Sequence, residues 1–136
     1  MRIGCPKEIK NKEYRVGLIP SVVSELVTLG HSVSIQTEAG IGSGFSDQEY
    51  REVGAQIIPN AASIFSENEM IIKVKEPQHN ERTLLQKDQV LFTYLHLAPD
   101  LTQTTDLIKS NVTAIAYETV TDEKGGLPLL APMSEV

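Results

Sequence analysis

Six short apolar runs recur along the chain and predict β-strands. Each run holds four to eight residues, and most are rich in Val, Ile, Tyr and Phe, which are common in strands. The runs cover residues 2–5, 32–36, 55–59, 70–75, 89–96 and 112–118. Several of the segments between these runs carry helical patterns instead.

Three helices are expected from apolar stripes at helical spacing, over residues 20–29, 46–54 and 99–111. The first begins at Pro20, which suits a first turn, and stops before Gly30, which suits a left-handed terminating position. The second opens with Ser46 and Glu49 in the spacing of a capping box and ends at Gly54. Both helices therefore have start and stop signals of their own.

The alternation of strands and helices predicts an α/β fold built from βαβ units. We expect a three-layer, doubly wound, mostly parallel sheet of the Rossmann-like or flavodoxin-like kind, with helices on both faces. At 136 residues the chain suffices for one domain with its own core. That domain is predicted over residues 1–128. After the turn "TDEKGGLP", residues 129–136 read as the start of a further helix, so something is expected to follow.

Composition narrows the function classes. The 40% apolar and 22% charged content is near the globular average, and no window approaches the ~18 consecutive apolar residues of a membrane span. The first residues lack the features of a signal peptide, so a soluble, cytoplasmic protein is expected. A net charge of −6 with singly scattered lysines argues against nucleic-acid binding. Small molecules and protein partners fit better.

The single cysteine, Cys5, cannot form an internal disulfide and has no companion cysteine for a metal site. It is either a catalytic thiol or a buried strand residue, and its place inside an apolar run favours burial. No metal site is predicted. The glycine-rich stretch 39–45 lacks the G-x-G-x-x-G spacing and is interpreted as a loop and not as a dinucleotide site.

Three basic residues are expected at one edge of the sheet, where open parallel sheets bind ligands beyond the carboxyl ends of their strands. The period of two places Lys75 and His96 at the ends of two strands. Arg15 stands in the loop after the first strand, flanked by apolar residues. An arginine fork and a lysine ammonium form an anion pocket, and a histidine beside them could move a proton on a bound oxo or hydroxyl group.

Each of these residues also has a plain structural interpretation. Lys75 could be a solvated strand cap, His96 a satisfied polar residue at the end of a core strand, and Arg15 a surface charge. Lys73 is expected to be structural and His79 to be solvated. The residues alone therefore predict an α/β domain with a crevice for a small carboxylic acid.

Six segments, read in order from Met1 to Val136, resemble the amino-terminal half of bacterial alanine dehydrogenases. They are "RIGCPKEIKNKEYRVGLIP", "AGIGSGFSD", "IIKVKEP", "LFTYLHLA", "AYETV" and "LPLLAPMSEV". The wider family includes the NAD-binding subunit of proton-translocating transhydrogenase and the lysine-forming saccharopine dehydrogenases. Transhydrogenase members share the opening motif without the "LHLA" histidine, so the resemblance points to alanine dehydrogenase.

This resemblance implies the reversible oxidative deamination of L-alanine to pyruvate and ammonia with NAD, in a homohexamer. Arg15 and Lys75 would hold the substrate carboxylate and carbonyl. After hydride transfer from Cα and addition of water to the imine, His96 would shuttle a proton as the carbinolamine collapses. Lys75 would stabilise charge on the carbonyl oxygen.

The resemblance also implies further residues of the site. Glu13, Tyr94 and Met133 would line the pocket, and Ser134 would lie near the cofactor at an interdomain cleft. Family enzymes continue through a helix into a nucleotide-binding Rossmann domain, which holds a catalytic aspartate, and return to complete the substrate domain. Residues 1–136 hold none of this, so we expect no turnover of alanine by this chain alone.

Three functions remain open at this stage. The chain is the substrate-binding part of an NAD-dependent alanine dehydrogenase, a stand-alone non-catalytic module for carboxylate binding or assembly, or a domain of the transhydrogenase α-subunit type. In the last case His96 would be incidental.

Overall fold

The computed structural model describes residues 1–95 and 100–119. Its strands are β1 (Arg2–Cys5), β2 (Ser32–Gln36), β3 (Gln56–Ile58), β4 (Met70–Ile72), β5 (Val90–Thr93) and β6 (Thr113–Ala116). Its α-helices are α1 (Pro20–Thr28), α2 (Asp47–Glu52), α3 (Ala61–Glu67), α4 (His79–Arg82) and α5 (Leu101–Ser110). Two 3-10 turns, η1 (Ile41–Ser43) and η2 (Tyr117–Thr119), complete the described elements. The predicted domain boundary at residue 128 and the helix start over 129–136 lie outside the described residues.

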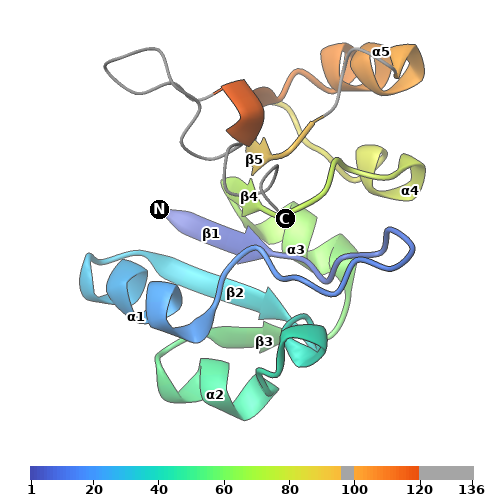
Figure 1. Ribbon diagram of the computed structural model, residues 1–136. Helices are drawn as coiled ribbons and strands as arrows, with labels where there is room; N and C mark the ends of the chain where they lie inside the picture. The colour runs from blue at the N-terminus through green and yellow to red at the C-terminus, as the bar shows by residue number, and fades with distance from the viewer. Residues whose placement is uncertain (96–99, 120–136) are drawn as a thin grey trace, which may run out of the picture.

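The six strands form one parallel sheet in the order β3-β2-β1-β4-β5-β6. Figure 1 shows β3, β2, β1, β4 and β5 following one another from the bottom of the view to the top. The chain winds outward from β1 to β3 and then crosses to β4 on the other side of β1. The predicted doubly wound parallel sheet is therefore confirmed. The strand order reverses between β1 and β4, which is where such sheets bind ligands.

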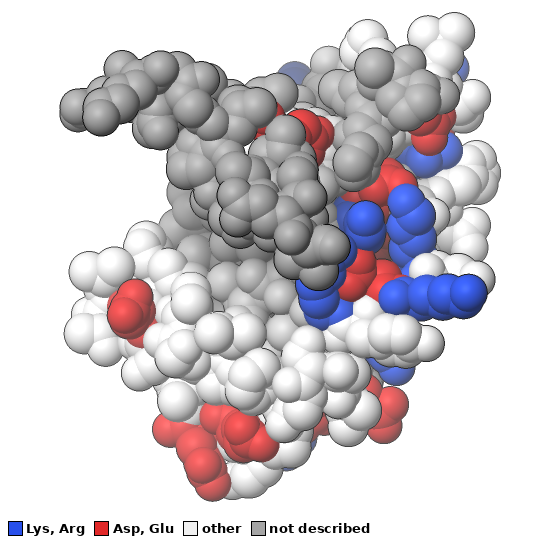
Figure 2. Space-filling view, viewed as in Figure 1, with Lys and Arg blue, Asp and Glu red and all other residues white. Residues whose placement is uncertain are grey.

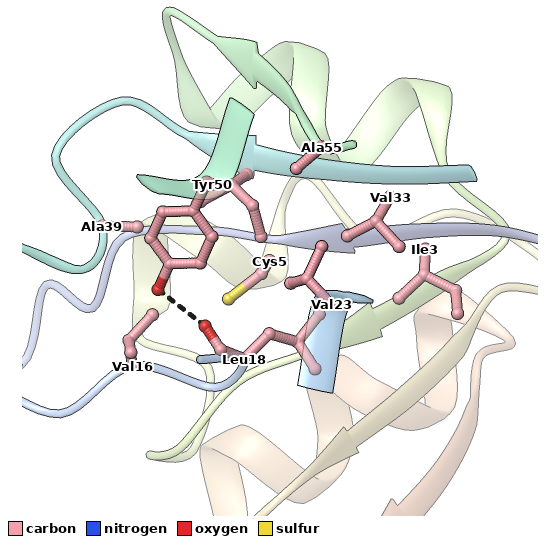
Figure 3. Close-up of a cluster of buried hydrophobic side chains, with 10 residues drawn as sticks. Ile3, Cys5, Val16, Leu18, Val23, Val33, Ala39, Tyr50 and Ala55 are labelled. Atoms are coloured by element: carbon pink, nitrogen blue, oxygen red, sulfur yellow. Dashed lines mark hydrogen bonds between the residues drawn. The ribbon is translucent and has the colours of Figure 1, made fainter. Parts of the chain in front are cut away.

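Two apolar clusters, one on each face, hold the layers together. The first lies under α1 and α2 and comprises Ile3, Cys5, Val16, Leu18, Val23, Val33, Ile35, Ala39, Tyr50 and Ala55 (Figure 3). The second lies under α3 and α5 and comprises Ile64, Phe65, Ile71, Leu85, Leu91, Leu95, Leu107 and Ala116. Within the first cluster, the buried hydroxyl of Tyr50 donates to the Leu18 carbonyl at 2.7 Å. This hydrogen bond holds the residues before α1 against α2.

The helix ends follow the local signals in the sequence. Pro20 occupies the first turn of α1, and Gly30 is left-handed with a φ of 95°. Ser46 caps α2, accepting from the amide of Glu49 in a complete capping box. Gly54, at a φ of 101°, follows the end of α2. These four predictions are confirmed.

The structure differs from the sequence-based prediction in two ways. Helices α3 and α4 were not predicted, because α3 has only two buried apolar residues, Ile64 and Phe65, and α4 is a single turn. His79 is exposed as expected, although it opens α4 and does not lie in a loop. The strands predicted over 70–75, 89–96 and 112–118 end early, at Ile72, Thr93 and Ala116.

Cys5 is fully buried in the first cluster (Figure 3), which confirms the interpretation as a strand residue. Burial, with a smaller contribution from the charge of Glu8, raises the pKa of the Cys5 thiol to about 12. We therefore expect a disulfide reagent at pH 8 to leave Cys5 unlabelled in the folded protein, with a thiolate population about 10³-fold below that of a free cysteine. Labelling should become complete in urea. Fast labelling without denaturant would contradict this burial.

Candidate functional site

The loop that follows β1 brings Arg15 to the switch point of the sheet. Gly17 lies against the end of β4, because a Cβ at this position would come 2.7 Å from the Ile72 carbonyl oxygen and 2.9 Å from the Lys73 Cα. Only glycine allows this approach of two backbones. The loop is thereby held over the carboxyl ends of the two central strands.

The glycine-rich stretch 39–45 supports the same loop from the other side. The Ser43 hydroxyl donates to the Tyr14 carbonyl at 2.9 Å, and a Cβ at Gly42 would come 2.7 Å from that carbonyl oxygen. These contacts fix the residue before Arg15. The stretch therefore has a packing role, which agrees with its interpretation as a loop.

Glu13 and Arg15 form a two-pronged ion pair. Arg15 donates from Nε to Glu13 Oε2 at 2.9 Å and from Nη2 to Oε1 at 2.7 Å, and its backbone amide donates to Oε2 at 3.0 Å. The side chain of Glu13 is 6% exposed and that of Arg15 is 41% exposed. The hydrogen bond from Arg15 is the main cause that lowers the pKa of Glu13, and the bond to Glu13 raises the pKa of Arg15. Both groups are therefore charged at neutral pH.

A cavity of about 450 Å³ opens beside Arg15. Its lining residues are Arg15, Val16, Gly17, Ile19, Ser43, Val74, Phe92, Tyr94 and Tyr117. The Tyr117 ring packs edge-on against Phe92 and Tyr94, with centroids 4.3 and 4.7 Å apart. Burial raises the pKa of Tyr117, so its phenol stays neutral. Apolar and aromatic walls with a few polar groups are typical of a small-molecule site.

Lys75 lies three residues beyond β4 and is half-buried. Its positive charge is the smallest of the contributions that lower the pKa of Glu13, after those of Arg15. A second, polar cavity of about 400 Å³ adjoins Arg15, with Lys7, Glu8, Lys10, Asn11, Lys12, Glu13, Tyr14, Glu38, Ala39, Ile41 and Gly42 as its other lining residues. Figure 2 shows basic and acidic side chains side by side on this part of the surface.

Of the predicted site residues, Arg15 and Tyr94 line the first cavity, and Glu13 is paired with Arg15 and lines the second. Lys75 follows β4 at the same edge of the sheet and is not among the lining residues of either cavity. The other three, His96, Met133 and Ser134, lie outside the described residues. Lys73, which was expected to be structural, is buried in an ion pair with Glu8 and Glu81.

Sequence reasoning missed Tyr117 and Glu118, which follow β6 at the same edge of the sheet. Glu118 accepts a hydrogen bond from the Leu95 amide at 2.9 Å, one residue before His96 in the chain. The rule that selected Lys75 and His96 at strand ends would also have selected these two residues.

Residues 1–95 and 100–119 contain no group of three or more His, Cys, Asp or Glu side chains that could hold a metal ion. None of their helices combines the length and the apolar content needed to cross a membrane.

Comparison with known proteins gives a consistent family. The family model "Alanine dehydrogenase/PNT, N-terminal domain" matches residues 4–136. The alanine dehydrogenase of Halomonas elongata is 53% identical over 136 residues, and that of Mycolicibacterium smegmatis is 52% identical. Each match covers all of this chain and 37% of the relative. The chain therefore spans little more than a third of the length of these relatives.

Solved structures agree with this family. An L-alanine dehydrogenase, 57% identical, superposes with a TM-score of 0.96 over 98% of this chain and 37% of its own. A transhydrogenase from Sinorhizobium meliloti, 25% identical, gives a TM-score of 0.81 over 87% of this chain and 35% of its own. The fold is therefore that of the amino-terminal domain in both kinds of protein.

Proposed function

Because the chain belongs to the family of alanine dehydrogenase/PNT N-terminal domains, we propose that it is the substrate-binding part of an NAD-dependent L-alanine dehydrogenase. One observation carries this proposal. Arg15, held by Glu13, lines a cavity of about 450 Å³ at the switch point of the sheet, and Lys75 follows β4 at the same edge. The guanidinium suits a carboxylate, and the cavity has room for a small carboxylic acid such as alanine or pyruvate.

The proposed roles follow from the chemistry of each side chain. The guanidinium of Arg15 binds the substrate carboxylate, since a planar fork of donors matches two carboxylate oxygens. The ammonium of Lys75 stabilises negative charge on the carbonyl or carbinolamine oxygen. His96 donates and accepts the proton of that oxygen. Tyr94 and Met133 line the pocket, and Glu13 holds Arg15 in position.

When bound, NAD supplies the acceptor for the hydride from Cα. The glycine-rich stretch 39–45 packs against Tyr14 and lacks the G-x-G-x-x-G spacing, and this chain spans only 37% of its alanine dehydrogenase relatives. We therefore propose that NAD binds mainly to another part of a longer polypeptide, with Ser134 at the cleft between the parts. We propose a cytoplasmic homohexamer for that polypeptide.

Two other functions make different predictions. A transhydrogenase-type domain would exchange hydride between two cofactors without alanine, and a stand-alone module would bind a carboxylate without turnover. The higher identity to alanine dehydrogenases, 53% against 25% for the transhydrogenase structure, favours the first proposal.

The deciding experiment measures alanine-dependent NADH formation by the full-length polypeptide that carries this chain. We expect turnover with the unsubstituted protein and a loss of about 10²–10⁴-fold for His96→Ala, because a general acid–base group contributes that much. The matched control is His79→Ala, since His79 is exposed on α4, and it should keep full activity.

Three outcomes would contradict the proposal. Absence of alanine turnover by the full-length protein would remove the enzyme assignment. Hydride exchange between cofactors that survives His96→Ala would support the transhydrogenase type instead. NADH formation from alanine by the isolated 136 residues would show that NAD binding is contained in this chain.

A further inference from the structure

The stretch before Lys75 loses its regular strand partner on one side. β1 and β4 pair with Gly4 opposite Ile71, and the same register would place Pro6 opposite Lys73. Proline has no amide hydrogen, so the ladder on this side stops. On the β5 side it continues, since the Lys73 amide donates to the Phe92 carbonyl at 3.1 Å. The residues after Ile72 therefore need other partners.

The side chain of Glu8 supplies these partners. Its Oε2 accepts from the Val74 amide and its Oε1 accepts from the Lys75 amide, both at 3.0 Å. The Lys73 ammonium donates to the Lys75 carbonyl at 2.8 Å. The Thr93 hydroxyl lies 3.0 Å from the Val74 carbonyl and 2.9 Å from that of Lys75. Every backbone polar group of these two residues is thus bound, and three side chains do most of this.

The charges that make these bonds are buried. Lys73 Nζ lies 3.0 Å from Glu8 Oε1 and 3.4 Å from Glu81 Oε1, and the three side chains are 1%, 2% and 3% exposed. The cost of removing such charged groups from water offsets much of their mutual attraction. Apolar side chains of similar volume at the same positions often give a protein of equal stability. Stability alone therefore does not account for this cluster. Its bonds converge on the backbone of one surface residue, Lys75.

We propose that Glu8 and Lys73 are positioning residues for Lys75. Their bonds fix the backbone of Lys75 so that its ammonium meets the carbonyl oxygen of a bound 2-oxo acid. This inference rests on the proposed function, in which Lys75 contacts the substrate. Misplacing a catalytic group by about 1 Å can lower the rate of a reaction about 10²-fold. Bonds that hold the backbone of Lys75 in place can therefore matter for catalysis.

The test replaces Glu8 with glutamine in the full-length polypeptide. Glutamine has one acceptor oxygen where glutamate has two. Its NH₂ group is a donor and would face the N–H groups of Lys73, Val74 or Lys75, which are donors too. We expect kcat/KM for pyruvate to fall about 10- to 100-fold, with the KM for NADH unchanged. Amide hydrogen exchange at residues 74 and 75 should accelerate at least about tenfold. The matched control is Glu69→Gln, which removes an exposed carboxylate that also accepts a backbone amide, that of Arg2.

A triple substitution separates positioning from charge balance. Glu8→Gln with Lys73→Met and Glu81→Gln removes all three buried charges, so it should recover the urea midpoint lost by Glu8→Gln alone. The kcat/KM for pyruvate should stay low, because glutamine at position 8 still lacks one of the two acceptors for the Val74 and Lys75 amides. Recovery of both quantities together would overturn the positioning role. If Glu8→Gln does not fold, Lys73→Met with Glu81→Gln leaves the net charge of the cluster unchanged and tests the bond from Lys73 to the Lys75 carbonyl.

The remaining outcomes distinguish the positioning role of Glu8 and Lys73 from the proposed function. Faster exchange at residues 74 and 75 with an unchanged kcat/KM for pyruvate would overturn the positioning role and leave the function intact. Unchanged exchange would show that Glu8 does not hold this backbone. If Lys75→Met keeps normal kinetics, the substrate role of Lys75 fails, and the positioning role fails with it.

Discussion

Replacing Lys75 with methionine should lower kcat/KM for pyruvate in the full-length polypeptide by about 10³-fold, the effect of losing one preorganised donor to a developing oxyanion. Methionine keeps the length of the side chain but removes its charge. The contacts that hold residue 75 are made by its backbone amide and carbonyl, so they remain. We therefore expect a normal melting temperature together with the loss of rate. Steady-state kinetics with pyruvate, ammonia and NADH would measure it.

Lys87→Met is the control for this substitution, since Lys87 is exposed and lies outside the site. It should leave kcat/KM within about twofold, as expected of a surface charge far from the substrate. A Lys75→Met protein with less than a threefold loss would remove Lys75 from the substrate site.

Replacing Phe65 with alanine should lower the free energy of unfolding by about 3–5 kcal/mol, the usual range for a buried phenylalanine. Phe65 is fully buried on α3, in the cluster that joins α3 and α5 to the sheet. The loss has two parts, the transfer of the ring to water and the cavity that it leaves. Urea unfolding of the purified chain would measure it, with the slope of the transition unchanged.

The matched control is Phe45→Ala, because Phe45 is only partly buried at the edge of the other cluster. It should cost about half as much or less, in proportion to the apolar area removed from water. Equal losses at the two positions would show that the second cluster does not carry the stability assigned to it here.

The fold was predictable where signals are local. Pro20, Gly30 and the Ser46–Glu49 capping box mark helix ends through groups a few residues apart, and the structure contains all of them. The ends of the strands were not predictable, because the alternation of apolar residues continues after the hydrogen bonds between the strands stop. The strand over 70–75 ends at Ile72 since Pro6, far away in the chain, cannot donate to it.

The candidate site was predictable to a similar extent. The rule for parallel sheets placed Lys75 after the end of β4, where the structure has it, and the loop after β1 brings Arg15 to the same edge of the sheet. Glu8 could not be recognised in the same way, because its partner Lys73 is 65 residues away. In the sequence, "PKEIKNKE" reads as a run of solvated charges. This buried ion pair becomes visible only when the segments that follow β1 and β4 are placed side by side.

The Glu13–Arg15 pair has a consequence for selectivity. Arg15, Lys75 and Glu13 together carry a net charge of +1, and a monocarboxylate neutralises it. A second carboxylate on the ligand, as in a four-carbon dicarboxylic acid, would bring a surplus negative charge close to Glu13. Specificity often depends on repulsion of this kind against the wrong ligand. In the proposed function, Glu13 would thus favour small monoacids over diacids by charge repulsion.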